Sequence, residues 1–92
     1  MRERAVEAAL VKAVKARGGI CPKWVSPGLD GVPDRIVLLP DGKIGFVELK
    51  APGEKPRRLQ MARMAQIERL GYKVFTCDRV ELIDGILKEI EG

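Results

Sequence analysis

The sequence predicts an α/β fold in which helices flank a mixed four-stranded sheet. Two strand-like runs on either side of the turn "LPDG" form an antiparallel hairpin. A helical segment and a further strand follow this hairpin, in the order of a right-handed βαβ crossover with parallel strands. The length of 92 residues is that of one domain, spanning residues 1–92.

The first elements are a helix and a short strand. Apolar residues at helical spacing predict a helix from Arg2 to Arg17, and the Gly-Gly pair after it ends the helix. The run "ICPKWV", Ile20 to Val25, predicts a strand. Pro22 places that strand at an edge of the sheet, because proline has no N–H to donate to a neighbour. The composition of residues 26–33 predicts a loop.

The hairpin turn sets the register of the next two strands. The order Pro40, Asp41, Gly42 is that of a type I turn, with Gly42 as the left-handed bulge residue of a three-residue loop. This geometry predicts three facing pairs, which are Leu39 with Lys43, Ile36 with Phe46, and Asp34 with Glu48.

The second half of the chain predicts helix, strand, helix. Pro56 fits the first turn of a helix that runs to about Leu70. Its expected inner face is formed by Leu59, Ala62, Ala65 or Gln66, and Leu70. A strand follows over residues 72–77. Asp78 is the expected N-cap of an additional C-terminal helix with Val80, Ile83, Leu87 and Ile90 in register.

Composition narrows the possible chemistry. Hydrophobic residues make up 46% of the chain, as in ordinary globular proteins. The absence of histidine removes Ser-His triads and most zinc hydrolase sites, so any catalysis must use carboxylates and lysine. The net charge of +4 favours a polyanionic partner. No apolar run reaches membrane-spanning length, and the charged N-terminus lacks the apolar centre of a signal peptide, so we expect a cytoplasmic protein with no membrane partner.

The two cysteines are expected to be structural. Cys21 and Cys77 lie far apart in the sequence, each within a predicted strand and beside apolar residues. This pattern favours small buried hydrophobes in a reducing compartment over a disulfide or a metal site.

Three charged residues meet on one face of the predicted sheet. Asp34 lies opposite Glu48, and Lys50 is two residues further along the same strand. Opposed carboxylates repel each other, and a divalent cation between them would remove the conflict; oxygen ligands favour Mg²⁺ or Mn²⁺. A metal beside a lysine suits phosphodiester hydrolysis. The alternative is that Asp34 caps a turn while Glu48 pairs with Lys50 or Lys43 on an exposed face.

A basic cluster begins the second predicted helix. Lys55, Arg57 and Arg58 have the wrong sign for the positive end of a helix dipole, but they suit a bound phosphate. The alternative is that each is a solvated surface charge.

The order of these motifs resembles that of a known family. Pro33-Asp34, thirteen intervening residues and then Glu48-Leu49-Lys50 look like the PD-(D/E)XK nuclease signature. The short length, "GVPDR", "FVELKA" and Gln60 resemble the stand-alone, phage-type VRR-NUC members of that superfamily. The resemblance covers nearly the whole chain and implies a restriction-endonuclease-like αβββαβ core with an additional C-terminal helix.

The resemblance also implies roles for individual residues. Asp34 and Glu48 would bind the metal with the main-chain carbonyl of Leu49, and Lys50 would position the attacking water. Glu7 matches an additional acidic position of the family, and Gln60 matches a glutamine that supports the site. The alternatives are that Glu7 pairs with Lys12 or Arg4, and that Gln60 is a solvated helix residue.

Known members of this kind imply a homodimer that cuts branched DNA such as Holliday junctions, in the host cytoplasm when the protein is viral. The apolar residues Trp24, Val25 and Leu29 beside the predicted edge strand are the expected dimer surface.

We therefore expect a metal-dependent, structure-selective endodeoxyribonuclease. One alternative is a non-catalytic nucleic-acid-binding module that keeps the fold. Another is an interaction protein in which the motif is fortuitous and no metal binds.

Overall fold

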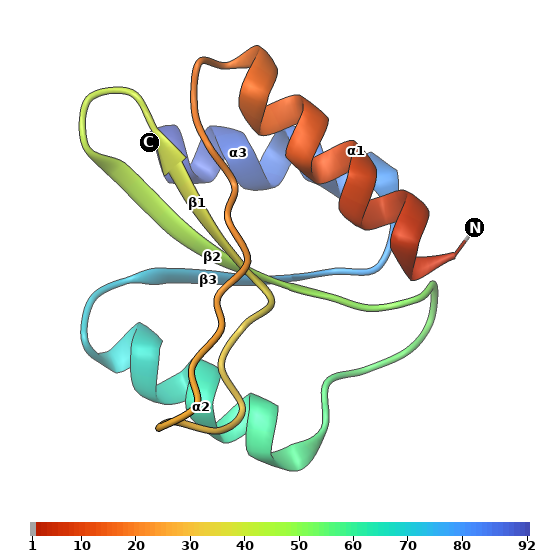
Figure 1. Cartoon of the computed structure of the whole chain (residues 1–92), viewed down its shortest axis with the longest axis vertical. Coiled ribbons are helices and arrows are strands. Elements are labelled where there is room, and N and C mark those ends of the chain that lie inside the picture. Colours follow the sequence, from red (N-terminus) through yellow and green to blue (C-terminus); the bar gives the residue numbers. More distant parts are fainter. Residues whose placement is uncertain (1) are drawn as a thin grey trace.

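The sheet has three strands rather than four, with helices on both faces (Figure 1). The computed structural model describes residues 2–92. The elements in chain order are α1 (Glu3–Ala16), β1 (Arg35–Leu39), β2 (Lys43–Leu49), α2 (Arg58–Arg69), β3 (Lys73–Cys77), a 3₁₀ turn (Val80–Leu82) and α3 (Ile83–Glu91). The α/β class and the mixed sheet predicted from sequence are confirmed; the number of strands was wrong.

The predicted fourth strand makes only two isolated bridges to β1. These bridges join Ile20 to Leu38 and Lys23 to Arg35. Pro22 lies between the two bridges, and its carbonyl accepts a hydrogen bond from the N–H of Ile36. Because proline has no N–H, it cannot donate the next bond of the ladder. The segment therefore runs along β1 without becoming a regular strand, and it covers that edge of the sheet.

The hairpin has the predicted register. β1 and β2 are antiparallel, with Leu39 opposite Lys43 and Ile36 opposite Phe46. Gly42 has a positive φ of 71°, as expected, but Asp41 also has a positive φ, of 66°. A type I turn requires a negative φ at its third position, so the predicted turn type was wrong although the loop length and the register were right.

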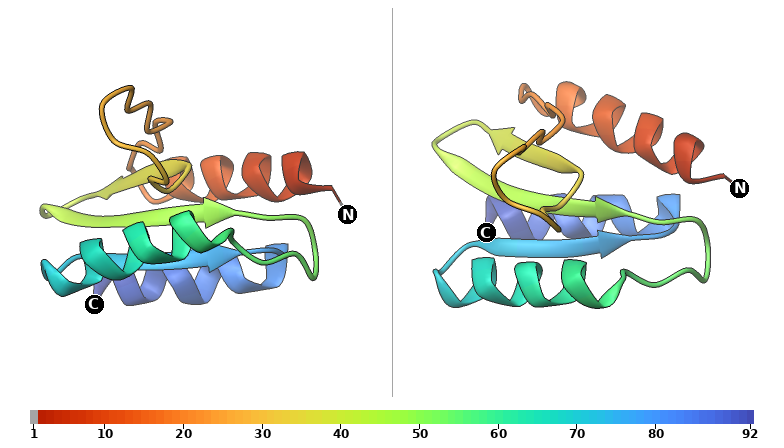
Figure 2. Two further views of the ribbon diagram at one scale, coloured as in Figure 1. Left: turned by 90° about the horizontal axis from the view of Figure 1, so that it is seen from below. Right: turned by 60° about the horizontal axis from the view of Figure 1, so that its bottom comes forward.

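The βαβ unit is confirmed, because β3 pairs with β2 in parallel. The sheet order is β1-β2-β3, and β3 forms an open edge of the sheet among the described residues. Figure 2 shows α2 on one face of the sheet and α1 with α3 on the other. The main core lies on the α1 and α3 side.

The side chains of β2 alternate between these two faces. Val47 and Leu49 are buried in the core against α1 and α3, whereas Phe46 and Glu48 point toward α2. Gly45 lies on the core side, where α3 is so close that a Cβ would be 2.5 Å from Ile90. β2 therefore stabilises the fold with one set of residues and presents the candidate site with the other.

The two remaining helices depart from expectation in detail. In α2 the buried residues are Met64 and Ile67, while Leu59 and Leu70 of the predicted inner face are exposed. Asp78 caps no helix; its carboxylate instead accepts a hydrogen bond from the N–H of Gly53. The 3₁₀ turn separates Asp78 from α3, which buries Ile83, Leu87 and Ile90 as predicted.

Both cysteines are buried and unpaired, in agreement with the sequence analysis. Burial raises the pKa of the Cys21 thiol and of the Cys77 thiol, which makes both poor nucleophiles. Over residues 2–92 the structure has no helix with the length and apolar character needed to cross a membrane.

Candidate active site

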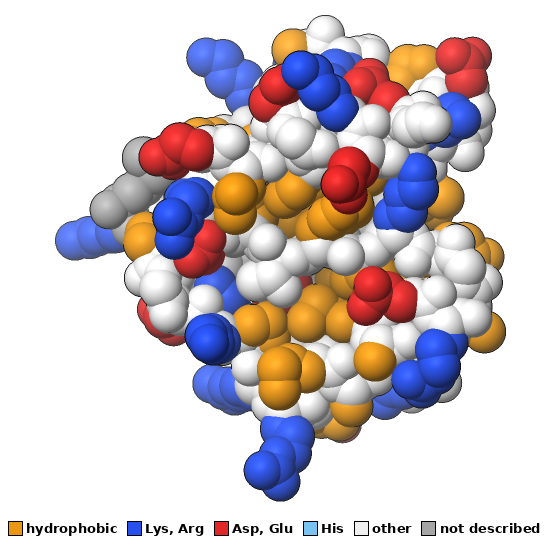
Figure 3. Space-filling model, turned by 180° about the vertical axis from the view of Figure 1, so that it is seen from behind, with side chains coloured by type: hydrophobic (Ala, Val, Ile, Leu, Met, Phe, Trp, Pro, Cys, Tyr) orange, Lys and Arg blue, Asp and Glu red, His pale blue; other side chains and the backbone are white. Residues whose placement is uncertain are grey.

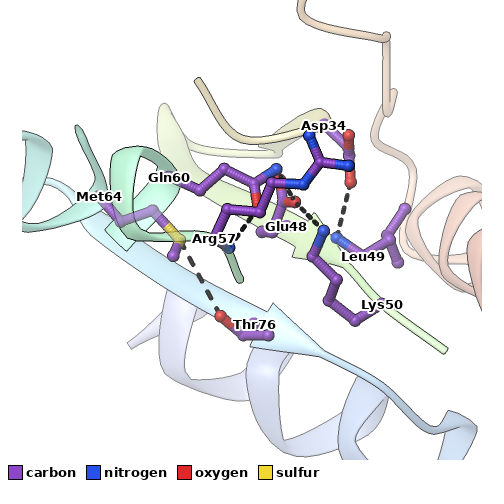
Figure 4. Close-up of polar contacts among 8 residues, drawn as sticks. All are labelled: Asp34, Glu48, Leu49, Lys50, Arg57, Gln60, Met64 and Thr76. Carbon is purple, nitrogen blue, oxygen red and sulfur yellow. Dashed lines mark hydrogen bonds and ion pairs between the residues drawn. The ribbon is translucent and has the colours of Figure 1, made fainter. Parts of the chain in front are cut away.

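Asp34, Glu48 and Lys50 come together at the end of the hairpin, as predicted (Figure 4). Asp34 precedes β1 and faces the end of β2, because the register that pairs Arg35 with Val47 brings it opposite Glu48. The Asp34 carboxylate accepts a hydrogen bond from the N–H of Leu49 at 2.8 Å. This bond fixes the first carboxylate beside the strand that carries the second.

Glu48 is the most unusual residue of the site. Its side chain is only 1% exposed. Among the described residues, no other charged side chain is buried. Oε2 accepts a hydrogen bond from Gln60 Nε2 at 2.7 Å and forms an ion pair with Lys50 Nζ at 3.3 Å, whereas Oε1 is buried with no hydrogen-bond partner. A buried carboxylate oxygen without a partner is costly, so this oxygen is available for a ligand.

The burial of Glu48 determines the electrostatics of the Asp34 and Glu48 pair. Burial raises the pKa of Glu48 to about 7; the negative charge of Asp34 raises it as well, while Lys50 acts in the opposite direction. A carboxyl with such a pKa is partly protonated at neutral pH when no cation is near. A bound cation would favour the charged form of Glu48.

Gln60 joins the site to α2. Its Nε2 donates to Glu48, and its Oε1 accepts from the N–H of Arg57 at 2.8 Å. Gln60 therefore satisfies one free donor at the start of the helix and orients the carboxylate at the same time. The alternative that Gln60 is a solvated helix residue was wrong.

The basic cluster is exposed at the start of α2. Lys55, Arg57 and Arg58 all lie in solvent and make no ion pair with any residue from 2 to 92. In Figure 4 the Arg57 side chain extends from α2 toward the carboxylates. The cluster is thus free to contact an anion that enters the site.

Glu7 lies on α1 and is paired with a residue outside the group of Asp34, Glu48 and Lys50. It forms an ion pair with Arg35 at 2.9 Å, a partner that differs from both Lys12 and Arg4. Arg35 also donates to the carbonyl of Cys21 at 2.7 Å. Within residues 2–92 no group of three or more Asp, Glu, Cys or His side chains is placed to hold a metal ion. The two carboxylates that the structure brings together are those of Asp34 and Glu48.

Three residues near the site were missed from sequence. Thr76 pairs with Glu48 across the parallel ladder, and the register of β2 and β3 would have revealed it. Asp78 anchors Gly53 in the loop that leads to the basic cluster, and Arg35 holds Glu7. Asp78 was expected to cap a helix, and neither Asp78 nor Arg35 could be linked to its partner from sequence, because Gly53 and Glu7 are distant along the chain.

No protein-family model matches the sequence. A protein of Acyrthosiphon pisum secondary endosymbiont phage 1, named "Putative nuclease p44", is 51% identical over 82 residues, which are 89% of this chain and 88% of that protein. A solved structure described as a VRR-NUC domain is 30% identical and superposes with a TM-score of 0.87 over 94% of each chain. The chain belongs to the VRR-NUC family.

Membership of the VRR-NUC family confirms the predicted phage-type resemblance. It also identifies the chain as an endonuclease, a phosphodiester hydrolase. Nucleases of this fold typically use divalent metals.

Proposed function

We propose that this VRR-NUC protein is a divalent-metal-dependent endodeoxyribonuclease that cuts branched DNA such as Holliday junctions. The observation that carries the proposal is the buried Glu48 carboxylate, with one oxygen lacking a partner, beside Asp34 and Lys50. A purely structural role would not require an unpartnered buried carboxylate next to a second acid.

The donor set fits a divalent cation. Glu48 Oε1 has no partner in the described chain, and the Asp34 carboxylate is held beside it by Leu49 N–H. Asp34, Glu48 and the main-chain carbonyl of Leu49 would hold the ion, and oxygen donors favour Mg²⁺ or Mn²⁺. When bound, such an ion polarises a phosphoryl oxygen and lowers the pKa of an attacking water. Glu7 would join the ligands only after giving up its ion pair with Arg35.

Lys50 and Gln60 orient the reacting groups, and Lys50 also neutralises part of the phosphate charge. Lys50 is mostly buried, and its ammonium lies 3.3 Å from Glu48 Oε2, so it can hold the attacking water at the site and offset the charge of the phosphate. Gln60 fixes the orientation of Glu48 through its 2.7 Å hydrogen bond. Each group is therefore placed before the substrate arrives, which reduces the cost of organising the transition state.

The basic cluster supplies substrate binding. Lys55, Arg57 and Arg58 are exposed, unpaired within residues 2–92, and at the helix terminus that adjoins Gln60. In our proposal they bind the phosphates that flank the cut, with the free N–H groups at the start of α2 contributing to the same contact.

A homodimer would give the paired incisions that a four-way junction requires. We place its interface on the open edge of β3 rather than on Trp24, Val25 and Leu29. Trp24 packs against Phe46 with ring centroids 5.1 Å apart, so part of its surface is already buried inside the molecule. The covered edge along β1 offers no ladder for a second copy.

The open edge has the features of an interface. Hollows of about 360 Å³ and 280 Å³ lie between β3 and α3 and between β3 and α2. Figure 3 shows apolar side chains gathered in these hollows on either side of the strand. The exposed Leu82 and Met61 lie at their rims. Acidic Glu81 and Glu68 in the same linings favour a protein partner over nucleic acid.

The backbone of β3 is complementary to itself. The carbonyl of Cys77 bonds to Lys50 N–H, so alternate residues bond to β2 while Val74 and Thr76 direct their N–H and C=O groups to the free edge. In an antiparallel pair centred on Phe75, Val74 of one copy would lie opposite Thr76 of the other. Both residues would then form ladder hydrogen bonds across a twofold axis.

The experiment is a cleavage assay on labelled four-way junction, flap, duplex and single-stranded DNA, each with Mg²⁺, Mn²⁺ or EDTA. We expect junction cutting with either metal and none in EDTA, with Glu48→Gln as the inactive control. Cleavage that persists in EDTA would overturn the metal requirement. Equal cutting of all four substrates would overturn the preference for branched DNA.

A further inference from the structure

An open groove follows the exposed side of α1, on the face of the sheet opposite α2 (Figure 2). It has a volume of about 440 Å³. Four cations and one carboxylate lie in its lining, with small or apolar residues between them: Arg4, Lys12, Lys15, Arg35, Glu7, Ala8 and Val11. The groove is therefore basic and has room for an extended ligand.

The single acid does not neutralise the groove. Glu7 is already paired with Arg35 at 2.9 Å, which leaves the other three cations in excess. Arg4, Lys12 and Lys15 form no ion pair among residues 2–92, and none of them is needed for packing, because all three are exposed. Lys12 and Lys15, three residues apart, repel each other on this helix face unless an anion binds there.

Their spacing fits a polyanion. Arg4, Lys12 and Lys15 lie eight and three residues apart, on one face of the helix. At a rise of about 1.5 Å per residue the row is about 16 Å long, which spans several phosphates of one strand. Ala8, between the first two cations, has only a methyl group and allows a backbone to approach the helix.

The groove begins near the active site. Figures 1 and 2 show that the N-terminal end of α1 lies at the end of the sheet where β2 finishes and the loop toward α2 begins. The ion pair between Glu7 and Arg35 links the groove to the residue after Asp34. A strand leaving the site past Lys50 could therefore continue along α1 toward Lys15.

We propose that this groove binds the phosphate backbone of a duplex arm of the substrate, separate from the phosphates held at the start of α2. This rests on the proposed function, in that the substrate is DNA. The lining contains no aromatic side chain, so it offers no platform for stacked bases and reads no sequence. Two basic surfaces on one subunit would allow it to hold two arms of a branched molecule.

The test compares two doubly neutralised variants. Lys12→Gln with Lys15→Gln removes two charges from the groove. Lys43→Gln with Arg69→Gln removes two exposed charges from positions outside the groove lining and is the matched control. Binding to a labelled four-way junction is measured over a range of salt concentrations, with each pair placed in the Glu48→Gln background to prevent cleavage.

We expect the groove variant to reduce the slope of log affinity against log salt by about 2 and to weaken binding on the order of tenfold, with little change in the control. In the enzyme with Glu48 intact, KM for the junction should rise while kcat is retained. A slope equal to that of the control would overturn the inference. A loss of kcat with unchanged KM would also overturn it.

The failure of this inference is distinguishable from that of the proposed function. If the wild-type protein cuts no DNA, the proposed function fails, yet the salt slope still reports on the groove. If the wild type cuts junctions and both double variants bind alike, the groove proposal alone fails.

Discussion

Gln60 contacts Glu48 with one end of its amide and the N-terminus of α2 with the other. Nε2 lies 2.7 Å from Glu48 Oε2, and Oε1 accepts from the N–H of Arg57 at 2.8 Å. The position of the helix and the orientation of the buried carboxylate are therefore coupled through one side chain.

Gln60→Ala should lower cleavage about 10- to 100-fold at saturating DNA and reduce the free energy of unfolding by about 1 kcal/mol, because Glu48 loses a donor and the helix loses a capping bond. Single-turnover cleavage and urea unfolding measure the two effects. Gln66→Ala, on an exposed position of the same helix, is the matched control. Equal rates in the two variants would show that Gln60 has no role in orienting Glu48.

Glu48→Gln should abolish cleavage while preserving the fold and most of the affinity for DNA. The substitution removes the charge that would hold a cation but keeps the shape and the buried position. Metal titration by calorimetry should show weakened binding of Mn²⁺, and gel-shift assays should show nearly unchanged DNA binding. Cleavage at the wild-type rate would exclude Glu48 as a ligand.

The stability of the metal-free protein should depend on pH through Glu48. Its pKa is about 7 in the folded protein, against 4.5 in the unfolded chain, so the folded state holds a proton that the unfolded state has released between these values. The contribution to stability is complete below about pH 4.5 and is lost as the pH rises through about 7, a change of about 3 kcal/mol.

Urea unfolding in EDTA across this pH range measures the effect. Glu48→Gln should flatten the profile and be more stable than the wild type above pH 7, since glutamine carries no charge to bury. Addition of Mg²⁺ or Mn²⁺ should restore stability to the wild type at high pH. A wild-type stability that rises between pH 5 and 7 relative to the variant would contradict the assigned cause.

Arg57→Ala combined with Arg58→Ala should weaken DNA binding and lower its salt slope by about 2, because two phosphate contacts are lost. Lys43→Ala with Arg69→Ala removes the same charge from exposed positions away from the site and serves as the control. Fluorescence anisotropy at several salt concentrations gives both slopes. If they coincide, the two arginines are solvated surface residues.

Two surfaces are candidates for the dimer interface, and substitutions on each can distinguish between them. Met61→Lys with Leu82→Lys adds charge beside the open edge of β3, and both positions are exposed in the monomer. We expect these changes to shift a dimer to monomer in sedimentation velocity and to reduce junction cutting more than metal binding. Val25→Asp, at a residue 80% exposed, tests the surface expected from sequence. If Val25→Asp dissociates the dimer and the β3-edge variant does not, the interface lies on the surface of Trp24, Val25 and Leu29.

Local geometry explains what the sequence predicted well. The loop Pro40–Gly42 fixed the register of the hairpin, and that register brought Asp34 opposite Glu48 with no long-range information. The helix between β2 and β3 required a parallel crossover, which the structure confirms. The site triad could be found because its members lie on one hairpin.

Long-range contacts explain the features that the sequence analysis predicted wrongly or missed. The inner face of α2 was wrong because it contains Gln60, one and two turns before Met64 and Ile67, and a polar residue breaks the apolar periodicity. The fourth strand was wrong because Pro22, which has no N–H, interrupts the pairing between its two bridges to β1. The partner of Glu7 lies on another element, and no spacing rule points to Arg35.

The alternation along β2 has a consequence for how such proteins diversify. Val47 and Leu49 hold the core, while Phe46 and Glu48 on the other face point toward α2. Changes on the α2 face can therefore alter the chemistry without entering the core. Substitutions on that face can thus alter or abolish cleavage while the scaffold of the fold is retained.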